Sequence, residues 1–164
     1  MASGGFVSFL YLFSTMIQRV QTVYLLIVAI LMVIMMSSNI GHFYTDDSVV
    51  SMSNLAVEQT EGVSDYTPWA LYAILLVTAV AALGTVFLYK RRMLQIRICL
   101  FSMILLVAYY IVLGIFAWGV LKSYGSFTPA WLICVPAISI ILEWLAIRAI
   151  GKDEMLVKAY DRLR

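Results

Sequence analysis

The chain has 164 residues, of which 63% are hydrophobic and only 12% are charged, with a formal net charge of +2. Soluble globular proteins average about 45–50% apolar and about 25% charged residues, and a soluble fold of this size has too large a surface for its volume to hide so much apolar side chain. The composition therefore argues against a water-soluble enzyme, a secreted disulfide scaffold, a disordered linker and a nucleic-acid-binding protein, and it predicts a protein of the lipid bilayer.

Four apolar stretches follow one another along the chain, at about residues 20–40, 69–89, 98–121 and 129–147. Each has roughly the 20 residues that a helix needs to cross about 30 Å of hydrocarbon, and none shows the alternation of a membrane barrel strand. We therefore predict an all-α fold, an integral membrane bundle of four transmembrane helices. Pro136 lies inside the fourth stretch, so we expect a kink there.

The connection between the first two stretches, residues 41–67, is long and lacks Lys and Arg. Its acidic residues are Asp46, Asp47, Glu58, Glu61 and Asp65. Two short β-prone pieces, 49–52 and 54–57, predict at most a small hairpin, because an isolated two-stranded unit is marginally stable in water.

The basic residues gather on one side of a four-span arrangement. Of the 11 Lys and Arg residues, all but Lys122 lie before the first stretch, between the second and third, or after the fourth. Positively charged loops stay in the cytoplasm. We therefore predict that both termini are cytoplasmic and that residues 41–67 face the opposite, periplasmic side.

The tail, residues 152–164, has an amphipathic pattern. Its apolar residues repeat at helical spacing, and charged residues of both signs cover the other face; the apolar residues are Met155, Leu156, Ala159, Tyr160 and Leu163. The pattern predicts a short cytoplasmic helix. Such a helix either lies on its own membrane surface or binds a partner protein.

Three segments, in order, carry a family resemblance: MIQRVQTVYLL (16–26), FLYKRRMLQIR (87–97) and AIRAIGKDEMLVKAYDRLR (146–164). Over residues 16–164 the chain resembles the family called domain of unknown function 4293, four-helix inner-membrane proteins of Gram-negative bacteria. The resemblance implies a fold and a location in the bacterial inner membrane, not an activity. Residues 1–15 precede the family's usual start, so we expect a non-native or poorly ordered extension and translation in the cell from Met16.

Glu143 is the only acidic residue within a predicted span, and an ionisable group in the membrane indicates a functional site by default. It lies about 7.5 Å from Arg148 along a helix, at about 1.5 Å per residue. From there it can reach the interface or form an ion pair with Arg97 or Arg148. Two interpretations stay open, a structural ion pair and a site for a proton, an ion or a partner.

We expect no catalytic, cofactor or metal site. Cys99 and Cys134 differ in depth by about 20 Å of helical rise, too far for a disulfide, and His42 is the one histidine. No phosphate-binding loop, HExxH, CxxC or Gly-x-Ser-x-Gly motif occurs.

The functional prediction is a non-enzymatic accessory or scaffold subunit of an inner-membrane assembly. Its expected contacts are the lipid bilayer and an unidentified membrane-protein partner or a second copy of the chain, with no nucleic acid. The partner-binding residues would be those of the tail: Met155, Leu156, Ala159 and Leu163. The alternative is a small oligomeric transporter or channel that uses Glu143.

Overall fold

The computed structural model describes residues 3–44, 49–58, 64–88, 91–121 and 125–161. Side chains are described from Val20 to Lys152 within these ranges, and at Met155.

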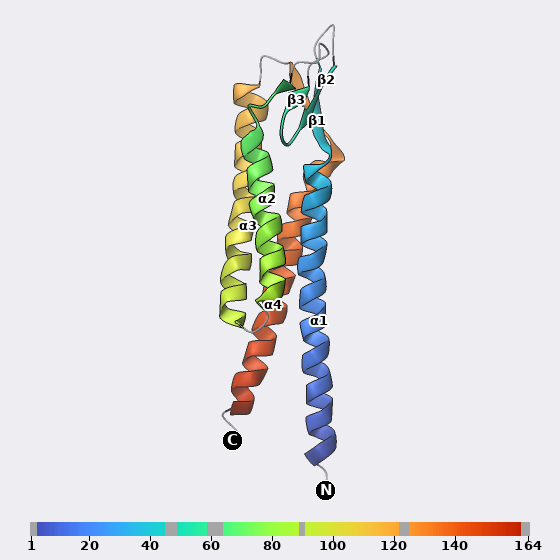
Figure 1. The fold of residues 1–164 in the computed structure, drawn as a ribbon, viewed down its shortest axis with the longest axis vertical. Coiled ribbons are helices and arrows are strands. Elements are labelled where there is room, and N and C mark those ends of the chain that lie inside the picture. Colours follow the sequence, from blue (N-terminus) through green and yellow to red (C-terminus); the bar gives the residue numbers. More distant parts are fainter. Residues whose placement is uncertain (1–2, 45–48, 59–63, 89–90, 122–124, 162–164) are drawn as a thin grey trace.

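Four long helices run side by side along the molecule (Figure 1). They are α1 (Ser3–Met36), α2 (Trp69–Phe87), α3 (Arg92–Ile115) and α4 (Val135–Asp161). Contacts run from α1 to α2, α2 to α3, α3 to α4 and α4 back to α1, so the helices form a closed bundle. Both termini lie at the same end of the bundle (Figure 1).

Three helical segments are long and apolar enough to cross a membrane: Trp69–Phe87, Arg92–Val120 and Trp131–Lys152. The second includes a π-helical turn, η1 (Phe116–Val120), and the third begins with a 3-10 turn, η3 (Trp131–Cys134). The apolar part of α1 with described side chains, Val20–Met36, is shorter than these three segments. The outer helix faces carry exposed apolar side chains, among them Val80, Ile104 and Ile141. The lengths of these helices and their exposed apolar side chains are therefore those of a membrane protein.

A five-stranded antiparallel sheet caps the end of the bundle away from the termini (Figure 1). Its strands are β1 (Asn39–Tyr44), β2 (Val49–Ser53), β3 (Val57–Glu58), β4 (Ser64–Asp65) and β5 (Ser126–Pro129), in the order β4-β3-β2-β1-β5. The all-α prediction was therefore wrong in part. The predicted hairpin exists as the β2–β3 pair, but it belongs to a larger sheet that packs against the helices.

The first predicted span ended too late, because α1 stops at Met36 and Ile40 lies in β1. The hydroxyls of Ser37 and Ser38 donate hydrogen bonds to the carbonyls of Val33 and Ile34, at 3.2 and 2.8 Å. These serines thereby satisfy carbonyl groups that the helix end leaves without an internal partner. The chain can then leave the helix and enter the sheet.

The fourth predicted span began too early, because residues 126–129 form β5 and α4 starts at Val135. Pro136 is thus the second residue of α4. A proline in the first helical turn removes no intrahelical hydrogen bond, so the kink expected there is not required. At its other end α4 continues to Asp161, so the predicted tail helix is an extension of α4 rather than a separate element.

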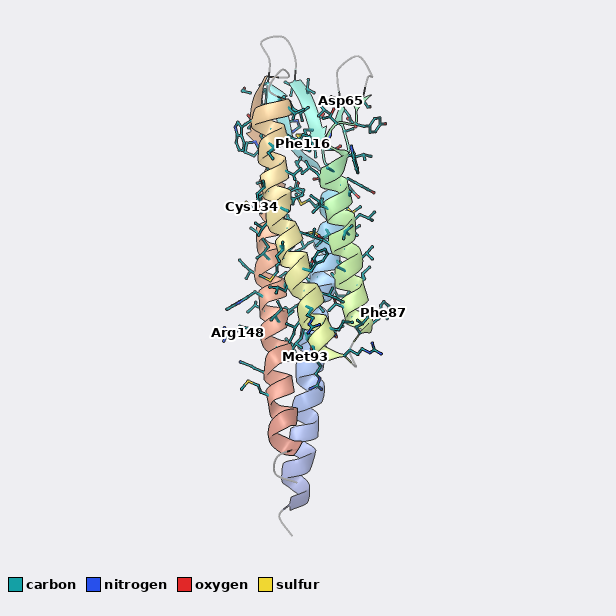
Figure 2. The ribbon with its side chains drawn as sticks, turned by 90° about the vertical axis from the view of Figure 1, so that its left-hand side faces the viewer. Asp65, Phe87, Met93, Phe116, Cys134 and Arg148 are labelled. Atoms are coloured by element: carbon teal, nitrogen blue, oxygen red, sulfur yellow. The ribbon has the colours of Figure 1, made fainter. Side chains whose placement is uncertain are left out.

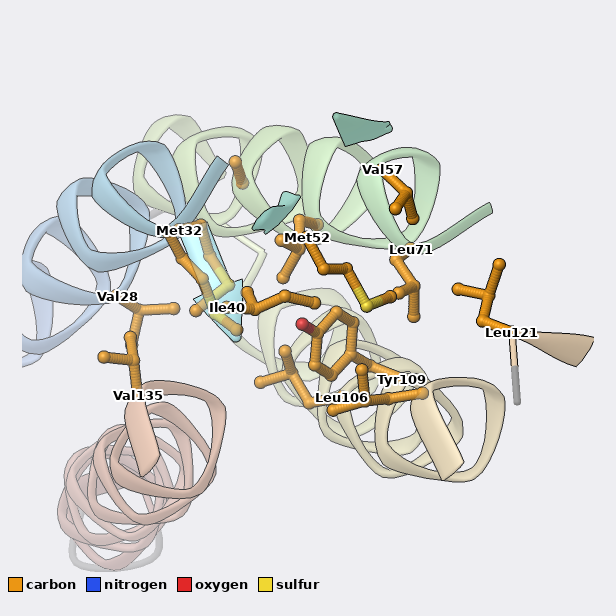
Figure 3. Close-up of a cluster of buried hydrophobic side chains, with 14 of the residues drawn as sticks. Val28, Met32, Ile40, Met52, Val57, Leu71, Leu106, Tyr109, Leu121 and Val135 are labelled. Atoms are coloured by element: carbon orange, nitrogen blue, oxygen red, sulfur yellow. The ribbon is translucent and has the colours of Figure 1, made fainter. Parts of the chain in front are cut away.

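The main hydrophobic core lies where the sheet meets the helices (Figure 3). Met32 of α1, Phe43 of β1, Met52 of β2, Leu71 of α2 and Tyr109 of α3 are all fully buried there. A smaller cluster, nearer the termini, joins Leu25, Cys99, Ala146 and Ile150. The bundle therefore has two apolar layers along its axis, and the buried polar residues lie beside and between them.

Candidate functional site

Glu143 of α4 is fully buried inside the bundle. The hydroxyl of Ser102 on α3 donates a hydrogen bond to its Oε1 at 2.5 Å. Its Oε2 is the one buried side-chain nitrogen or oxygen without a hydrogen-bond partner in the part of the chain that the structure describes. Because buried polar groups in proteins are nearly always paired, this oxygen marks Glu143 as the principal candidate site.

Glu143 lies about as far from the basic residues as the sequence indicated. Its partner Ser102 is five residues from Arg97 along α3, about 7.5 Å at about 1.5 Å per residue. Arg97 is exposed, and the guanidinium of Arg148 lies 4.9 Å from the centre of the Trp144 ring, a cation–π contact. The predicted ion pair is therefore not formed among the described side chains, and the carboxyl group is buried between the helices.

Other buried polar residues lie at the level of Ser102. On the buried face of α3, Cys99 lies one turn from Ser102 and beside the side chain of Thr85 on α2. Cys99 and Ser102 belong to the buried face of α3, which begins at Gln95. We call Glu143, Ser102, Cys99 and Thr85 the Glu143 cluster.

A second polar layer lies next to the Glu143 cluster, toward the termini. The amide of Gln21 on α1 donates to the side-chain oxygen of Gln95 on α3 at 2.9 Å. The amide of Gln95 donates in turn to the backbone carbonyl of Thr85 at 2.8 Å. Thr85 thus links this glutamine pair to the Glu143 cluster, and all four helices contribute buried polar groups to this part of the bundle.

The buried face of α3 changes character beyond Ser102, where its next members are Leu106, Tyr109 and Leu113. Two buried hydroxyls on neighbouring helices are used locally: Thr78 bonds to the carbonyl of Ile74 and Ser139 to that of Val135, within their own helices. On the side that faces the sheet, the buried face of α3 is therefore apolar from Leu106 as far as the hydroxyl of Tyr109.

Asn54, which the sequence analysis did not select, joins the sheet to two helices. It lies between β2 and β3 and is fully buried. Its amide donates to the carbonyl of Met35 on α1 at 2.7 Å, and the hydroxyl of Tyr109 donates to its side-chain oxygen at 2.7 Å. A polar residue between two β-prone pieces reads as a turn residue in sequence, so its burial depends on contacts distant in the chain.

The family model described as Domain of unknown function (DUF4293) matches residues 17–163. The chain belongs to this family. The match confirms the resemblance seen in the sequence and covers α1 from residue 17, the other three helices, the sheet and the Glu143 cluster. No curated protein sequence matches the chain.

The DUF4293 match also includes most of the tail. α4 carries the tail as helix to Asp161, and Met155 is 75% exposed. The side chains of Leu156 and Ala159 lie outside those described, and Leu163 lies outside the described residues. The structure therefore places the backbone of the predicted partner-binding stripe on a helix, and the stripe itself stays a prediction.

Cys99 and Cys134 are both free, the first buried and the second exposed, as predicted. Within the described ranges, no group of three or more His, Cys, Asp or Glu side chains is placed to hold a metal ion. Residues 3–15, predicted to be a poorly ordered extension, are the first part of α1.

Proposed function

We propose that this DUF4293 protein is a multi-pass protein of the bacterial inner membrane and a non-enzymatic accessory subunit or scaffold of a membrane assembly. The three membrane-length helical segments support the membrane location. Arg92, Arg97 and Arg148 lie in the half of the bundle nearer the termini, and Figure 2 shows Arg148, Met93 and Phe87 at a similar level along its long axis. The positive-inside rule then favours cytoplasmic termini and a periplasmic sheet.

The observation that carries the partner role is the length of α4. In Figure 1 the C-terminal part of α4 extends past the end of the α2–α3 pair. This part is helical, has an exposed Met155 and belongs to the DUF4293 match. Membrane-surface helices combine large apolar anchors with a basic face, whereas the tail has modest apolar residues and nearly balanced charges. A protein surface can use both charge signs, so a protein partner fits the tail better than lipid does.

Truncation after Gly151 tests this role. It removes the tail but keeps Ile150, which belongs to the apolar cluster near the termini. We expect the truncated chain to insert and to stay as abundant as the full chain. Purification in mild detergent at native expression should yield a stoichiometric partner with the full chain and lose it with the truncated one.

A matched pair of full-length variants distinguishes the contribution of the tail's apolar residues to partner binding from that of its charged residues. Replacement of Leu156 and Ala159 by Ser should release the partner, whereas replacement of Lys152 and Lys158 by Ser should weaken its binding only partly. An unchanged set of co-purifying proteins after truncation would contradict the partner role. So would degradation of the truncated chain, because the tail would then be part of the bundle.

A small transporter or channel that uses Glu143 is the second candidate, favoured by the unpaired Oε2. A path through the bundle would have to pass the apolar layer formed by residues such as Leu106, Leu75 and Met32, which are fully buried. We therefore rank this function below the first. A clean homo-oligomer that conducts ions in liposomes would reverse that order.

A further inference from the structure

Among the described residues, no positively charged side chain pairs with the carboxyl group of Glu143. Ser102 donates its one hydrogen bond, and Oε2 receives none from the described residues. A carboxylate in such surroundings would carry a full charge with almost no compensation, which costs several kcal/mol in protein interiors. A protonated carboxyl group removes that cost, because it is neutral and needs only ordinary hydrogen bonds.

The groups that face Glu143 from each helix do not supply the missing charge. α3 presents Ser102, and Cys99, which carries no positive charge, lies one turn away on the same buried face. On α2, the hydroxyl of Thr85 donates to the carbonyl of Ala81. α1 contributes Gln21, which does not titrate and is already bonded to Gln95. On α4 itself, Arg148 lies over Trp144. Tyr24 packs against the apolar cluster of Leu25, Cys99, Ala146 and Ile150.

We propose that Glu143 is a proton-binding site inside the bundle, and that it exchanges its proton with water on the side of the membrane where the termini lie. Oε1 accepts the hydrogen bond from Ser102, and Oε2 is the atom that carries the proton. The inference does not depend on the accessory role, because a proton site can serve a subunit of any assembly.

The direction of exchange follows from the arrangement of polar groups. Toward the termini, the buried face of α3 continues with Cys99 and Gln95, and Gln95 is hydrogen-bonded to Gln21 and to the backbone carbonyl of Thr85. Toward the sheet, the buried face of α3 is apolar from Leu106 up to the hydroxyl of Tyr109, which is bound to Asn54. Proton transfer requires groups or water molecules that accept and donate hydrogen bonds, so the termini side offers the better route.

Infrared spectroscopy tests the bound proton directly. The C=O stretch of a protonated carboxylic acid is separate from the amide and carboxylate bands, and a detergent without ester groups leaves that region clear. At neutral pH the full chain should show this band, and Glu143→Gln should lack it while keeping its fold, because the amide is neutral. Ser102→Ala should shift the band, since it removes the hydrogen bond to Oε1, and the exposed Glu58→Gln should leave it unchanged.

Absence of the band in the wild-type chain at neutral pH would overturn the proposal, as would its persistence in Glu143→Gln. The band should disappear on titration to alkaline pH, when the carboxyl group loses its proton. Adding NaCl at constant pH should leave it in place. Loss of the band on addition of Na⁺ would assign the site to a monovalent cation rather than to a proton.

Hydrogen–deuterium exchange tests from which side of the bundle the proton of Glu143 exchanges with water. In D₂O the band moves to lower frequency as O–H becomes O–D. The double variant Gln21→Leu/Gln95→Leu replaces both partners of a hydrogen bond by apolar groups of similar size, a change that bundles tolerate well. It should slow the band shift severalfold, whereas Tyr109→Phe on the sheet side should not. If Tyr109→Phe slowed the exchange and the glutamine variant did not, the route would lie on the side of the sheet instead.

Discussion

At the scale of single residues, several buried polar side chains are hydrogen-bonded to elements distant in sequence. Asn54 holds the last turn of α1 and the middle of α3 through Met35 and Tyr109. Sequence reasoning selected Glu143, because it is the lone acid in an apolar run. It could not find Ser102, because the pairing of α3 with α4 at that level depends on how the two helices are placed along their axes.

The Tyr109–Asn54 hydrogen bond gives a prediction at this scale. Tyr109→Phe leaves the side-chain oxygen of Asn54 buried without a donor, and an unsatisfied buried polar group costs about 1–3 kcal/mol. Thermal unfolding in detergent should show a clear loss of stability. Tyr44→Phe is the control, since the Tyr44 side chain is half exposed. Equal stability of the two variants would show that Asn54 finds another partner.

At the scale of elements, helices were easier to predict than strands. The apolar run of residues 20–40 contains both the end of α1 and the start of β1, and hydropathy alone does not separate them. β5 has only four residues and pairs with β1, which is distant in sequence, so no local sequence pattern predicts this strand. The β2–β3 pair was foreseen because its strands are close neighbours in the chain.

Gly41 provides a test of the β1–β5 contact. A Cβ added there would lie 2.5 Å from the ring of Phe127 and 2.8 Å from the carbonyl oxygen of Thr128. Gly41→Ala should therefore push β5 away from β1 and cost about 1–3 kcal/mol, as overpacked sites do. Gly84→Ala is the matched control, because a Cβ at Gly84 in α2 meets nothing within 4 Å. The account of the sheet would be wrong if both variants unfolded at the same temperature.

At the scale of the whole molecule, the even number of helices places the termini together and the sheet at the other end (Figure 1). The four apolar stretches predicted the number of helices, and the distribution of Lys and Arg predicted that both termini lie on one side. Neither pattern depends on any single contact. The cap over the bundle was missed, since it is assembled from strands on both sides of the α2–α3 pair. One end of the bundle is therefore covered by the sheet, and at the other end α1 and α4 extend past the α2–α3 pair.

The central claim is that this bundle spans the bacterial inner membrane with its sheet outside and its termini inside. The most direct measurement uses a thiol reagent that does not cross membranes, applied to intact cells that express single-cysteine variants in a background with Cys99 and Cys134 replaced by Ser. Leu55, between β2 and β3, and Arg91, beside the first residue of α3, are both exposed. A cysteine at position 55 should be labelled in intact cells, whereas one at position 91 should be labelled only after the cells are lysed. Labelling of position 91 but not position 55 in intact cells would contradict the orientation, and labelling of both would contradict the membrane bundle itself.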